Sequence, residues 1–207
     1  FHVLVEDDRI KEISDRPISS QQDQLRRIDL AGATLMPGLI DAHVHVKATV
    51  MSLGSLNNMP STYLFAGAAN IMKDMLMRGF TTVRDLGAGD DTIFKLRDGI
   101  NDGELIGPRI LAAGNIIGVG GRENGKECNG PDSCRKTTRD MIRDGADWIK
   151  IYSSCSGGQL CSNEDGSPMF FDDEIKAITD VANKYGIKVA AHSHPRDSAL
   201  MVLQYGV

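Results

Sequence analysis

The sequence predicts an α/β fold in which parallel β-strands alternate with α-helices. Five strand-then-helix units follow one another along residues 37–207, with a repeat of about 30 to 50 residues that is typical of βαβ architecture. The strand candidates are short apolar runs of the length that a buried parallel strand needs. Several of these runs end on or contain a histidine, a lysine or an aspartate, so the side chains suited to chemistry recur at similar positions in successive units.

Composition and charge are those of an ordinary globular protein and give no sign of a nucleic-acid or membrane partner. The 207 residues are 41% hydrophobic and 25% charged, with a formal net charge of −5 at pH 7, which is normal for a folded chain. No block of lysine and arginine indicates binding to nucleic acid or to an anionic membrane. No apolar run approaches the roughly 18 residues of a membrane span. We therefore expect neither a nucleic-acid nor a membrane partner and leave homo-oligomerisation open.

The amino-terminal residues carry no visible export signal, which sets the expected compartment and the expected state of the cysteines. Residues 1–8 are strand-like and lack the basic segment of a signal peptide, so we expect a cytoplasmic protein unless a precursor has lost its signal. The four cysteines form two pairs of equal spacing, Cys128 with Cys134 and Cys155 with Cys161. Neither pair has the CxxC spacing of a structural zinc site. Two disulfides would suit a secreted chain, but a cytoplasmic location predicts reduced thiols.

The first 36 residues have the pattern of short β-strands separated by turns. Asp7-Asp8 and Ala31-Gly32 are turn signals, and the polar residues 14–24 are expected to form a surface loop. The expected strands cover residues 2–5, 9–13, 27–30 and 34–36.

The first strand–helix unit contains a pair of histidines at the end of an apolar run. Pro37 and Gly38 mark a turn, and residues 39–44 have the length and composition of a buried parallel strand. His43 and His45 stand two positions apart, so on a strand their side chains point to the same side. Two neutral imidazoles from one strand would supply half of a tetrahedral metal shell. A solvent-facing edge strand is the alternative, but the expected burial of the run on both faces favours a metal site.

Residues 37–45, Pro-Gly-Leu-Ile-Asp-Ala-His-Val-His, closely resemble the first-strand signature of the amidohydrolase superfamily of metal-dependent hydrolases. The resemblance implies a (β/α)8 TIM-type barrel beside a small β-sandwich, with the metal at the carboxyl ends of the barrel strands. On this basis residues 1–36 form part of the β-sandwich, and residues 37–207 form the first part of the barrel with its first five βα units. A complete barrel takes about 250 residues, so we expect an incomplete portion of a longer protein.

The second and third units contribute one carboxylate near the expected site. A helix is expected over residues 60–78, followed by a strand over residues 80–86 that is similar to the family's TTVRD string. Asp85 lies at the carboxyl end of this strand, where we expect it to hydrogen-bond a loop or a neighbouring histidine rather than to act in catalysis. A helix over residues 90–101 and a strand over residues 108–114 follow.

The glycine-rich residues 118–121 after the third strand do not have the pattern of a phosphate loop. They lack the Lys-Ser/Thr ending, and no helix follows at once. Members of the resembled family often have a histidine after the paired glycines. Here Arg122 stands in that place and the loop is shorter, so the family's substrate contacts are not carried over to this loop.

The fourth unit places a lysine inside an apolar strand. A helix over residues 131–144 leads to a strand over residues 146–152, where Lys150 lies between Ile149 and Ile151. A desolvated ammonium is costly there, so the lysine either snorkels to solvent or reacts as a free amine with CO2 to give an anionic carbamate that bridges metal ions. Many members of the resembled family carry a carboxylated lysine on this strand, in a string similar to DxIKI. We therefore expect Lys150 to be a metal ligand.

A second His-x-His pair ends the fifth strand. A helix over residues 172–185 leads to a strand over residues 187–194, and another helix is expected over residues 195–205. This strand is similar to the family's VAAHAH pattern, which implies that His192 is a metal ligand. His194 is expected to line the pocket and contact substrate, or to orient a metal ligand through a hydrogen bond.

The resemblance as a whole implies a metal-dependent hydrolase. His43, His45, Lys150 and His192 would bind one or two divalent ions, expected to be zinc, and metal-bound hydroxide would attack an amide carbonyl. A further histidine and the general-base aspartate are expected beyond Val207, so no catalytic base is assigned within the chain.

The expected substrate follows from the group that the chain resembles, the imidazolonepropionase-like proteins that include Xaa-Pro and Xaa-Arg dipeptidases. We expect cleavage of a C–N amide bond in a dipeptide or N-acyl amino acid, as by a metallo-dipeptidase or carboxypeptidase. Hydrolysis of a cyclic amide of the imidazolone type is the alternative within enzymes. A non-catalytic partial or pseudo-enzyme chain is the alternative outside them.

Overall fold

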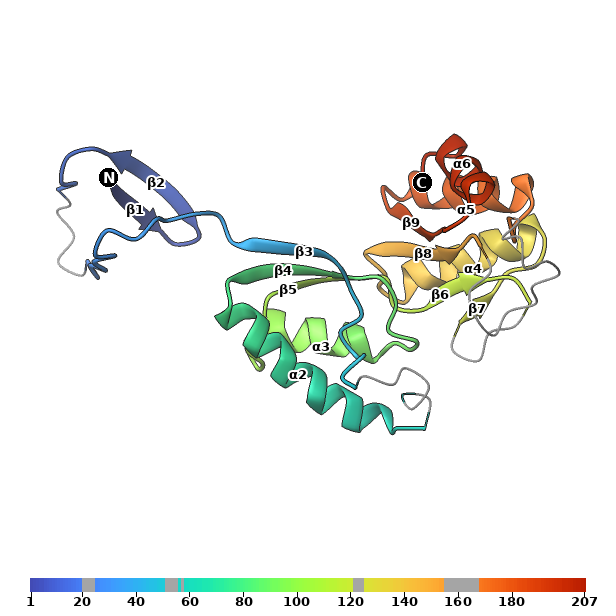
Figure 1. Cartoon of the computed structure of the whole chain (residues 1–207), viewed down its shortest axis with the longest axis horizontal. Coiled ribbons are helices and arrows are strands. Elements are labelled where there is room, and N and C mark those ends of the chain that lie inside the picture. Colours follow the sequence, from blue (N-terminus) through green and yellow to red (C-terminus); the bar gives the residue numbers. More distant parts are fainter. Residues whose placement is uncertain (20–24, 51–55, 57, 121–124, 155–167) are drawn as a thin grey trace. The chain divides into compact units, whose positions relative to one another are not determined.

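The computed structural model describes residues 1–19, 25–50, 56, 58–120, 125–154 and 168–207 of the chain (Figure 1). These residues form two compact units, Phe1–Pro37 and Gly38–Val207. The first unit contains an antiparallel pair of strands, and the second alternates parallel strands with helices. An α/β fold with parallel strands and a small antiparallel pair is therefore confirmed. The assignment of residues 1–36 to a β-sandwich and of residues 37–207 to a barrel stays a prediction.

The antiparallel pair is a hairpin of β1 (His2–Glu6) and β2 (Arg9–Ser14). Asp7 and Asp8 connect the two strands, as their turn signal predicts. Asp7 takes the left-handed backbone conformation, with φ at 54°, which aspartate tolerates better than most residues. The turn signal in the sequence therefore indicates correctly where the hairpin reverses.

The two strands predicted over residues 27–30 and 34–36 are not strands in the structure. The backbone turns between them, because Asp29 Oδ1 accepts the Ala31 N–H at 2.8 Å and the Leu30 carbonyl accepts the Ala33 N–H at 2.8 Å. The predicted turn at Ala31-Gly32 is therefore correct. An extended segment becomes a strand only when a neighbour pairs with its backbone, and these residues pair with no strand in the described part of the chain.

The larger unit contains the predicted strands and helices in the predicted order, with bounds that agree within two residues, and it also contains β6 and β7, which were not predicted. Figure 1 labels its elements, which are β3 (Leu39–Val44), α2 (Ser61–Met77), β4 (Phe80–Asp85), α3 (Thr92–Asn101), β5 (Arg109–Ala112), β6 (Ile116–Gly118), β7 (Lys126–Glu127), α4 (Pro131–Arg143), β8 (Trp148–Tyr152), α5 (Asp172–Lys184), β9 (Lys188–His192) and α6 (Arg196–Gln204). Within the described ranges, no helix is long and apolar enough to cross a membrane.

The predicted third strand, residues 108–114, forms only β5, and after a break the chain forms β6, which the sequence did not predict. β5 pairs with β4 in the sheet β3-β4-β5, whereas β6 pairs with β8 in the sheet β7-β6-β8-β9. Gly114 lies at the break with φ at +71°, and a Cβ atom there would come within 2.5 Å of the Phe94 ring. Only glycine fits this left-handed, crowded position. At this bend the chain leaves the sheet that contains β5 and enters the sheet that contains β6.

Backbone and side-chain hydrogen bonds of Asp147 join the two sheets at this bend. The Asp147 N–H donates to the Ala112 carbonyl at 2.8 Å, and Asp147 Oδ2 accepts the Ala112 N–H at 2.9 Å. Arg97 from α3 also donates to Asp147 Oδ2 at 2.9 Å. The carboxyl end of β5 is thereby tied to the start of β8.

The core lies where the strands pack against the helices. One face of β8 packs into this core, so the other face is available for a functional site. Ile149 and Ile151 are fully buried and belong to the same apolar cluster as Ile178 of α5. Because side chains alternate along a strand, Trp148 and Lys150 lie on the opposite face of β8.

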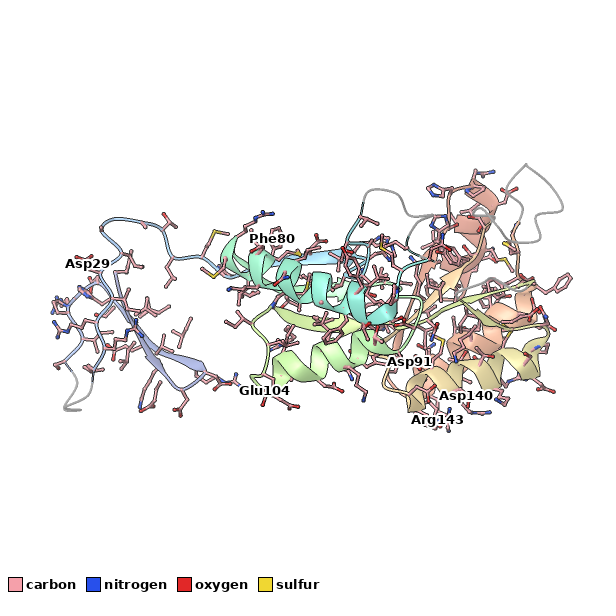
Figure 2. All side chains as sticks on the ribbon, turned by 90° about the horizontal axis from the view of Figure 1, so that it is seen from below. Asp29, Phe80, Asp91, Glu104, Asp140 and Arg143 are labelled. Carbon is pink, nitrogen blue, oxygen red and sulfur yellow. A yellow bond between two sulfur atoms is a disulfide. The ribbon has the colours of Figure 1, made fainter. Side chains whose placement is uncertain are left out.

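Helix α4 shows the same division between a packed face and a charged face. Its buried residues are Cys134, Thr138 and Met141. Asp140 and Arg143 project from the charged side (Figure 2) and form an ion pair at 2.7 Å. The helix therefore packs through one stripe, as an amphipathic surface helix does.

The structure contains a disulfide between Cys128 and Cys134, so the prediction of reduced thiols is wrong for this pair. The chain reverses between β7 and the first turn of α4, which brings the two Cα atoms to 4.6 Å, within the range that a disulfide spans. Both cysteines are fully buried. The spacing alone did not reveal the bridge because it depends on this reversal. Cys155 and Cys161 lie outside the described residues.

Replacing both bridged cysteines, Cys128→Ala with Cys134→Ala, is expected to lower the free energy of unfolding by about 2 kcal/mol, because the bridge closes a short loop and restricts the unfolded chain. Denaturant unfolding of the full-length protein would measure this change. Reduction of the wild-type protein should produce the same fall, and the double variant should not respond to reductant. An unfolding midpoint of the wild-type protein that is equal under oxidising and reducing conditions would contradict the prediction.

Candidate metal and catalytic site

His43 and His45 lie on one side of the end of β3, as predicted. Their ring centroids are 5.3 Å apart in an edge-to-face arrangement. The prediction that residues 39–44 are buried on both faces is wrong, because β3 pairs only with β4 in the described part of the chain. Leu39 is 41% exposed and Ile40 is 67% exposed. Burial of this strand therefore no longer supports a metal site, and the support comes from the groups around the two imidazoles.

The surroundings of His43 favour its neutral form. Partial burial lowers the pKa of His43, and the positive charges of Lys150, His45 and Arg84 lower it further against the opposing effect of Asp41. The neutral imidazole is the form that binds a metal ion. The same effect shows that Lys150 on β8 lies within electrostatic reach of His43 on β3.

Asp85 is a structural residue at the end of β4, as predicted. It is fully buried, and its two carboxylate oxygens accept the N–H groups of Val46 at 2.7 Å and Gly87 at 2.9 Å. The Gly87 carbonyl oxygen lies 2.9 Å from Nδ1 of His45. Burial raises the pKa of Asp85, and the two backbone hydrogen bonds partly oppose this rise.

Lys150 is a buried lysine whose side chain has no polar partner among the residues that the structure describes. The residue is only 2% exposed, so it does not snorkel to solvent, and no hydrogen bond or ion pair of its side chain occurs among the described residues. Burial lowers the pKa of Lys150, and the positive charge of Arg84 lowers it further. Both effects favour the neutral amine, which is the nucleophilic form.

Arg84 is a site residue that the sequence reasoning missed. Its guanidinium lies 4.2 Å from the centre of the Trp148 ring, and its Nε donates to the Ala42 carbonyl at 2.7 Å. Trp148 shares a face of β8 with Lys150, so Arg84 brings a second positive charge to that face. Its signal in the sequence was weak, a charged residue inside a predicted strand but directly before Asp85.

The second histidine pair lies at and just after the end of β9. The ring centroids of His192 and His194 are 4.5 Å apart, and the His192 ring lies 5.2 Å from the Tyr152 ring on β8. The His192 carbonyl accepts the Ser153 N–H at 3.0 Å, and the His194 N–H donates to Ser154 Oγ at 3.3 Å. These hydrogen bonds hold the ends of β8 and β9 side by side.

The structure thus brings the predicted ligands together only in part. Each His-x-His pair is close, and the charge of Lys150 reaches His43, but the described residues contain no group of three or more His, Cys, Asp or Glu side chains arranged to hold a metal ion. Lysine is not one of these four residue types. The ligand set His43, His45, Lys150 and His192 therefore stays a prediction, and Arg122 lies outside the described residues.

An open cleft of about 750 Å³ occurs elsewhere, at the amino-terminal end of α5 and along α6. Its lining residues are Pro168, Phe170, Phe171, Asp172, Asp173, Asp197, Leu200, Met201 and Gln204. None of the predicted ligands lines this cleft, so it does not form part of the candidate site.

The segment after His45 is anchored by a partly buried ion pair. Lys47 is 6% exposed, and its Nζ donates to Asp90 Oδ2 at 2.5 Å. Ser61 donates to the same oxygen at 2.7 Å, and the Thr92 N–H donates to Asp90 Oδ1 at 3.0 Å. Burial disfavours the ionised form of Asp90, but the hydrogen bonds from Lys47, Thr92 and Ser61 outweigh it and lower the pKa to about 2.

The stability that Asp90 contributes is expected to be lost in acid. Because its pKa in the folded protein lies below the ordinary value of 3.8, ionised Asp90 stabilises the fold above about pH 4, and this contribution disappears as the pH falls through about 2. The difference in unfolding free energy between the wild type and Asp90→Asn should therefore shrink over this range. Asp102→Asn, at an exposed helix end, is the control, and a difference that stays constant with pH would contradict the prediction.

Comparisons with known proteins match the chain to one family and to several relatives. The model of the amidohydrolase family matches residues 34–204. An uncharacterized protein of Mycobacterium tuberculosis is 28% identical over 179 residues, which make up 85% of this chain and 44% of the relative. A protein of Mycobacterium bovis, also uncharacterized, matches with the same identity and coverage.

Solved structures match the whole architecture. The crystal structure of an amidohydrolase has a TM-score of 0.86 and 31% identity, covering 99% of this chain and 54% of that one. A prolidase in complex with N-methylphosphonate-L-proline has a TM-score of 0.85 and 30% identity with the same coverage. A Xaa-Pro dipeptidase with methionine in its active site has a TM-score of 0.70 and 32% identity, covering 83% of this chain and 46% of that one. The chain therefore spans about half the length of these relatives.

Proposed function

We propose, because this chain belongs to the amidohydrolase family, that it is part of a metal-dependent hydrolase that cleaves the C–N bond of a small amide. A dipeptide, in particular one with a carboxy-terminal proline, or an N-acyl amino acid is the proposed substrate. This choice rests on the similarity to a prolidase and a Xaa-Pro dipeptidase. Since the chain spans about half of these relatives, the activity is proposed for the whole protein.

The observation that carries the proposal is the buried Lys150 side chain. An amine that is 2% exposed and lacks a described polar partner is costly unless something else satisfies it. A divalent cation, held directly or through a carbamate, would do so. The neighbouring donors are imidazole nitrogens, which together with oxygen ligands suit zinc, so the residues present fit such an ion.

The proposed ligands are His43, His45, Lys150 and His192. One or two bound zinc ions would polarise the substrate carbonyl and lower the pKa of a water molecule. Within the chain, the low pKa of His43 keeps its imidazole neutral and ready to bind. His194, which is beside His192, is proposed to contact the substrate.

Lys150 is proposed to become a carbamate. The lone pair of the neutral Nζ attacks the carbon of CO2, a new C–N bond forms, one C=O electron pair moves to oxygen, and the nitrogen loses a proton to solvent. Burial and Arg84 favour the neutral amine that this step requires. Once formed, the carbamate anion would be stabilised by the same Arg84 charge that disfavoured the ammonium.

Asp85 does not serve as the general base in this proposal. It is fully buried, and both of its oxygens accept backbone N–H groups. A carboxylate held in this way cannot also reach a water molecule or a leaving group, since a general base must lie within hydrogen-bond distance of the proton that it takes.

Replacing His43 or His192 with alanine is expected to weaken zinc binding by at least about 100-fold. Loss of a residue that hydrogen-bonds to a metal ligand costs up to about 100-fold in affinity, and loss of the ligand itself should cost at least as much. Elemental analysis of the purified full-length protein would measure zinc content. His2→Ala is the matched control, because His2 lies in β1 of the other compact unit. Full zinc content in both His43→Ala and His192→Ala would show that these residues are not ligands.

The proposed activity is tested with a panel of dipeptides and N-acyl amino acids. The full-length protein should hydrolyse members of this panel, lose activity when a chelator removes the metal, and recover it when zinc is restored. Hydrolysis of cyclic amides alone would replace the proposed substrate class with the imidazolone type. A metal-loaded protein that hydrolyses neither class would instead indicate a non-catalytic chain.

A further inference from the structure

The carboxylate of Asp85 fastens the ends of two strands together. Val44 of β3 is in register with Asp85 of β4, and the Leu86 N–H donates to the Val44 carbonyl at 3.0 Å. Beyond this point, Asp85 accepts the N–H of Val46 on one side and the N–H of Gly87 on the other, at 2.7 and 2.9 Å. One buried side chain thus holds Val46, which follows His45, and Gly87, which follows Leu86.

Gly87 is held in a conformation that other residues rarely adopt. Its φ is +137°, and a Cβ atom at this position would lie 2.4 Å from Cδ1 of Ile116 and 3.7 Å from Cε1 of the His45 ring. The backbone of Gly87 therefore passes close to the imidazole. Its carbonyl oxygen points at Nδ1 of His45 from 2.9 Å.

A carbonyl oxygen can only accept a hydrogen bond, so Nδ1 of His45 must carry the proton. In a neutral imidazole the other nitrogen, Nε2, then keeps its lone pair. No corresponding hydrogen bond from the His43 ring to a backbone carbonyl occurs in the part of the chain that the structure describes. The two histidines of the pair therefore differ in how their tautomer is set.

We infer that Asp85 and Gly87 are positioning residues that fix His45 as the Nδ1–H tautomer, with the Nε2 lone pair free to bind a divalent cation. Asp85 acts through Gly87: it holds the Gly87 amide, the amide places the carbonyl, and the carbonyl selects the tautomer. The link to cation binding rests on the proposed function. The tautomer itself is a property of the metal-free protein and does not depend on that function.

The first test uses the wild-type, full-length protein without metal, so that no bound ion selects the tautomer. Nitrogen-15 NMR of histidine-labelled protein distinguishes a protonated from an unprotonated ring nitrogen, and the His45 signals are identified by their loss in His45→Asn. Nδ1 of neutral His45 is expected to be protonated and Nε2 unprotonated. A neutral His45 with the proton on Nε2 would overturn the inference, whether or not any variant folds.

The second test separates positioning from simple structural support. Asp85→Asn removes one of the two backbone hydrogen bonds while keeping the side-chain shape, because an amide has only one acceptor oxygen. It is expected to raise the population of the Nε2–H tautomer of His45. It is also expected to weaken zinc binding by about 10- to 100-fold, the usual cost of losing a residue that orients a metal ligand through hydrogen bonds. Zinc affinity is measured by competition with a chelator.

Glu174→Gln is the matched control. Glu174 is also a buried carboxylate whose two oxygens accept backbone N–H groups, from Gly130 at 2.6 Å and from Phe171 at 2.9 Å, but it lies in the first turn of α5. Glu174→Gln should lower stability without changing the His45 tautomer or the zinc affinity. If Asp85→Asn leaves both unchanged, or if Glu174→Gln changes them equally, the positioning role of Asp85 is wrong.

The outcomes also keep this inference apart from the proposed function. A protein in which His45 carries the Nδ1 proton but which hydrolyses no amide would retain the tautomer assignment and lose the proposed activity. A zinc-dependent hydrolase in which neutral His45 carries the Nε2 proton would retain the activity and lose the tautomer assignment.

Discussion

Replacing Lys150 with alanine is expected to remove bound metal and hydrolase activity together. Lys150 is buried, its pKa is lowered by burial and by Arg84, and in the proposed site it becomes an anionic ligand. Two divalent cations would stabilise that anion and offset the cost of burying it. Loss of the ligand should weaken metal binding by at least about 100-fold, since loss of a residue that only hydrogen-bonds to a ligand already lowers metal affinity by up to that factor.

Metal content, activity and chemical rescue would be measured on the full-length Lys150→Ala protein. Short-chain carboxylic acids should restore part of the metal content and part of the activity by occupying the position of the carbamate. Lys188→Ala is the matched control, because Lys188 is an exposed lysine in β9. A metal-loaded wild-type enzyme whose Lys150 is an unmodified amine, not bonded to any metal, would exclude the bridging role and favour a mononuclear site.

Residues 1–207 expressed alone are expected to aggregate or to remain without fixed packing, rather than to form a cooperative monomer. In the described part of the chain, β3 pairs only with β4 and β9 pairs only with β8, so both present unpaired backbone groups. Large apolar side chains are also exposed, with Ile40 of β3 at 67% and Leu203 of α6 at 64%. Open edges combined with exposed apolar surface favour association between chains.

Size-exclusion chromatography with light scattering and a thermal melt would test this prediction, with the full-length protein as the control. The full-length protein should give a defined oligomer and a sharp transition, whereas the shorter chain should not. A monodisperse monomer of residues 1–207 that unfolds sharply and reversibly would show that this portion folds by itself.

The parts of the fold that were predictable from the sequence are those set by local periodicity and turn chemistry. In the described part of the chain, all five helices and five of the strands from Leu39 onward followed from apolar spacing, and the hairpin reversal followed from Asp7-Asp8. Asp85 was expected to hold a loop, and its two backbone hydrogen bonds confirm that role.

The parts that the sequence did not reveal depend on distant residues. The break between β5 and β6 arises because Gly114 passes close to Phe94 of α3, a contact with no local signal. The Cys128–Cys134 bridge requires the chain reversal before α4. The exposure of Leu39 and Ile40 depends on how many neighbours β3 has, and apolar composition alone cannot show whether a strand lies at an edge.

The break at Gly114 has a consequence for how the protein opens in its native state. The layer of β3, β4 and β5 and the layer of β6, β8 and β9 have separate ladders, joined at the bend by the hydrogen bonds of Asp147 and Ala112. Native-state hydrogen exchange should therefore report two groups of amides that open with different free energies. His43 and His45 lie in or directly after β3 of the first layer, whereas Lys150 and His192 lie in β8 and β9 of the second. A metal ion bound by all four residues would therefore make the two groups of amides exchange as one.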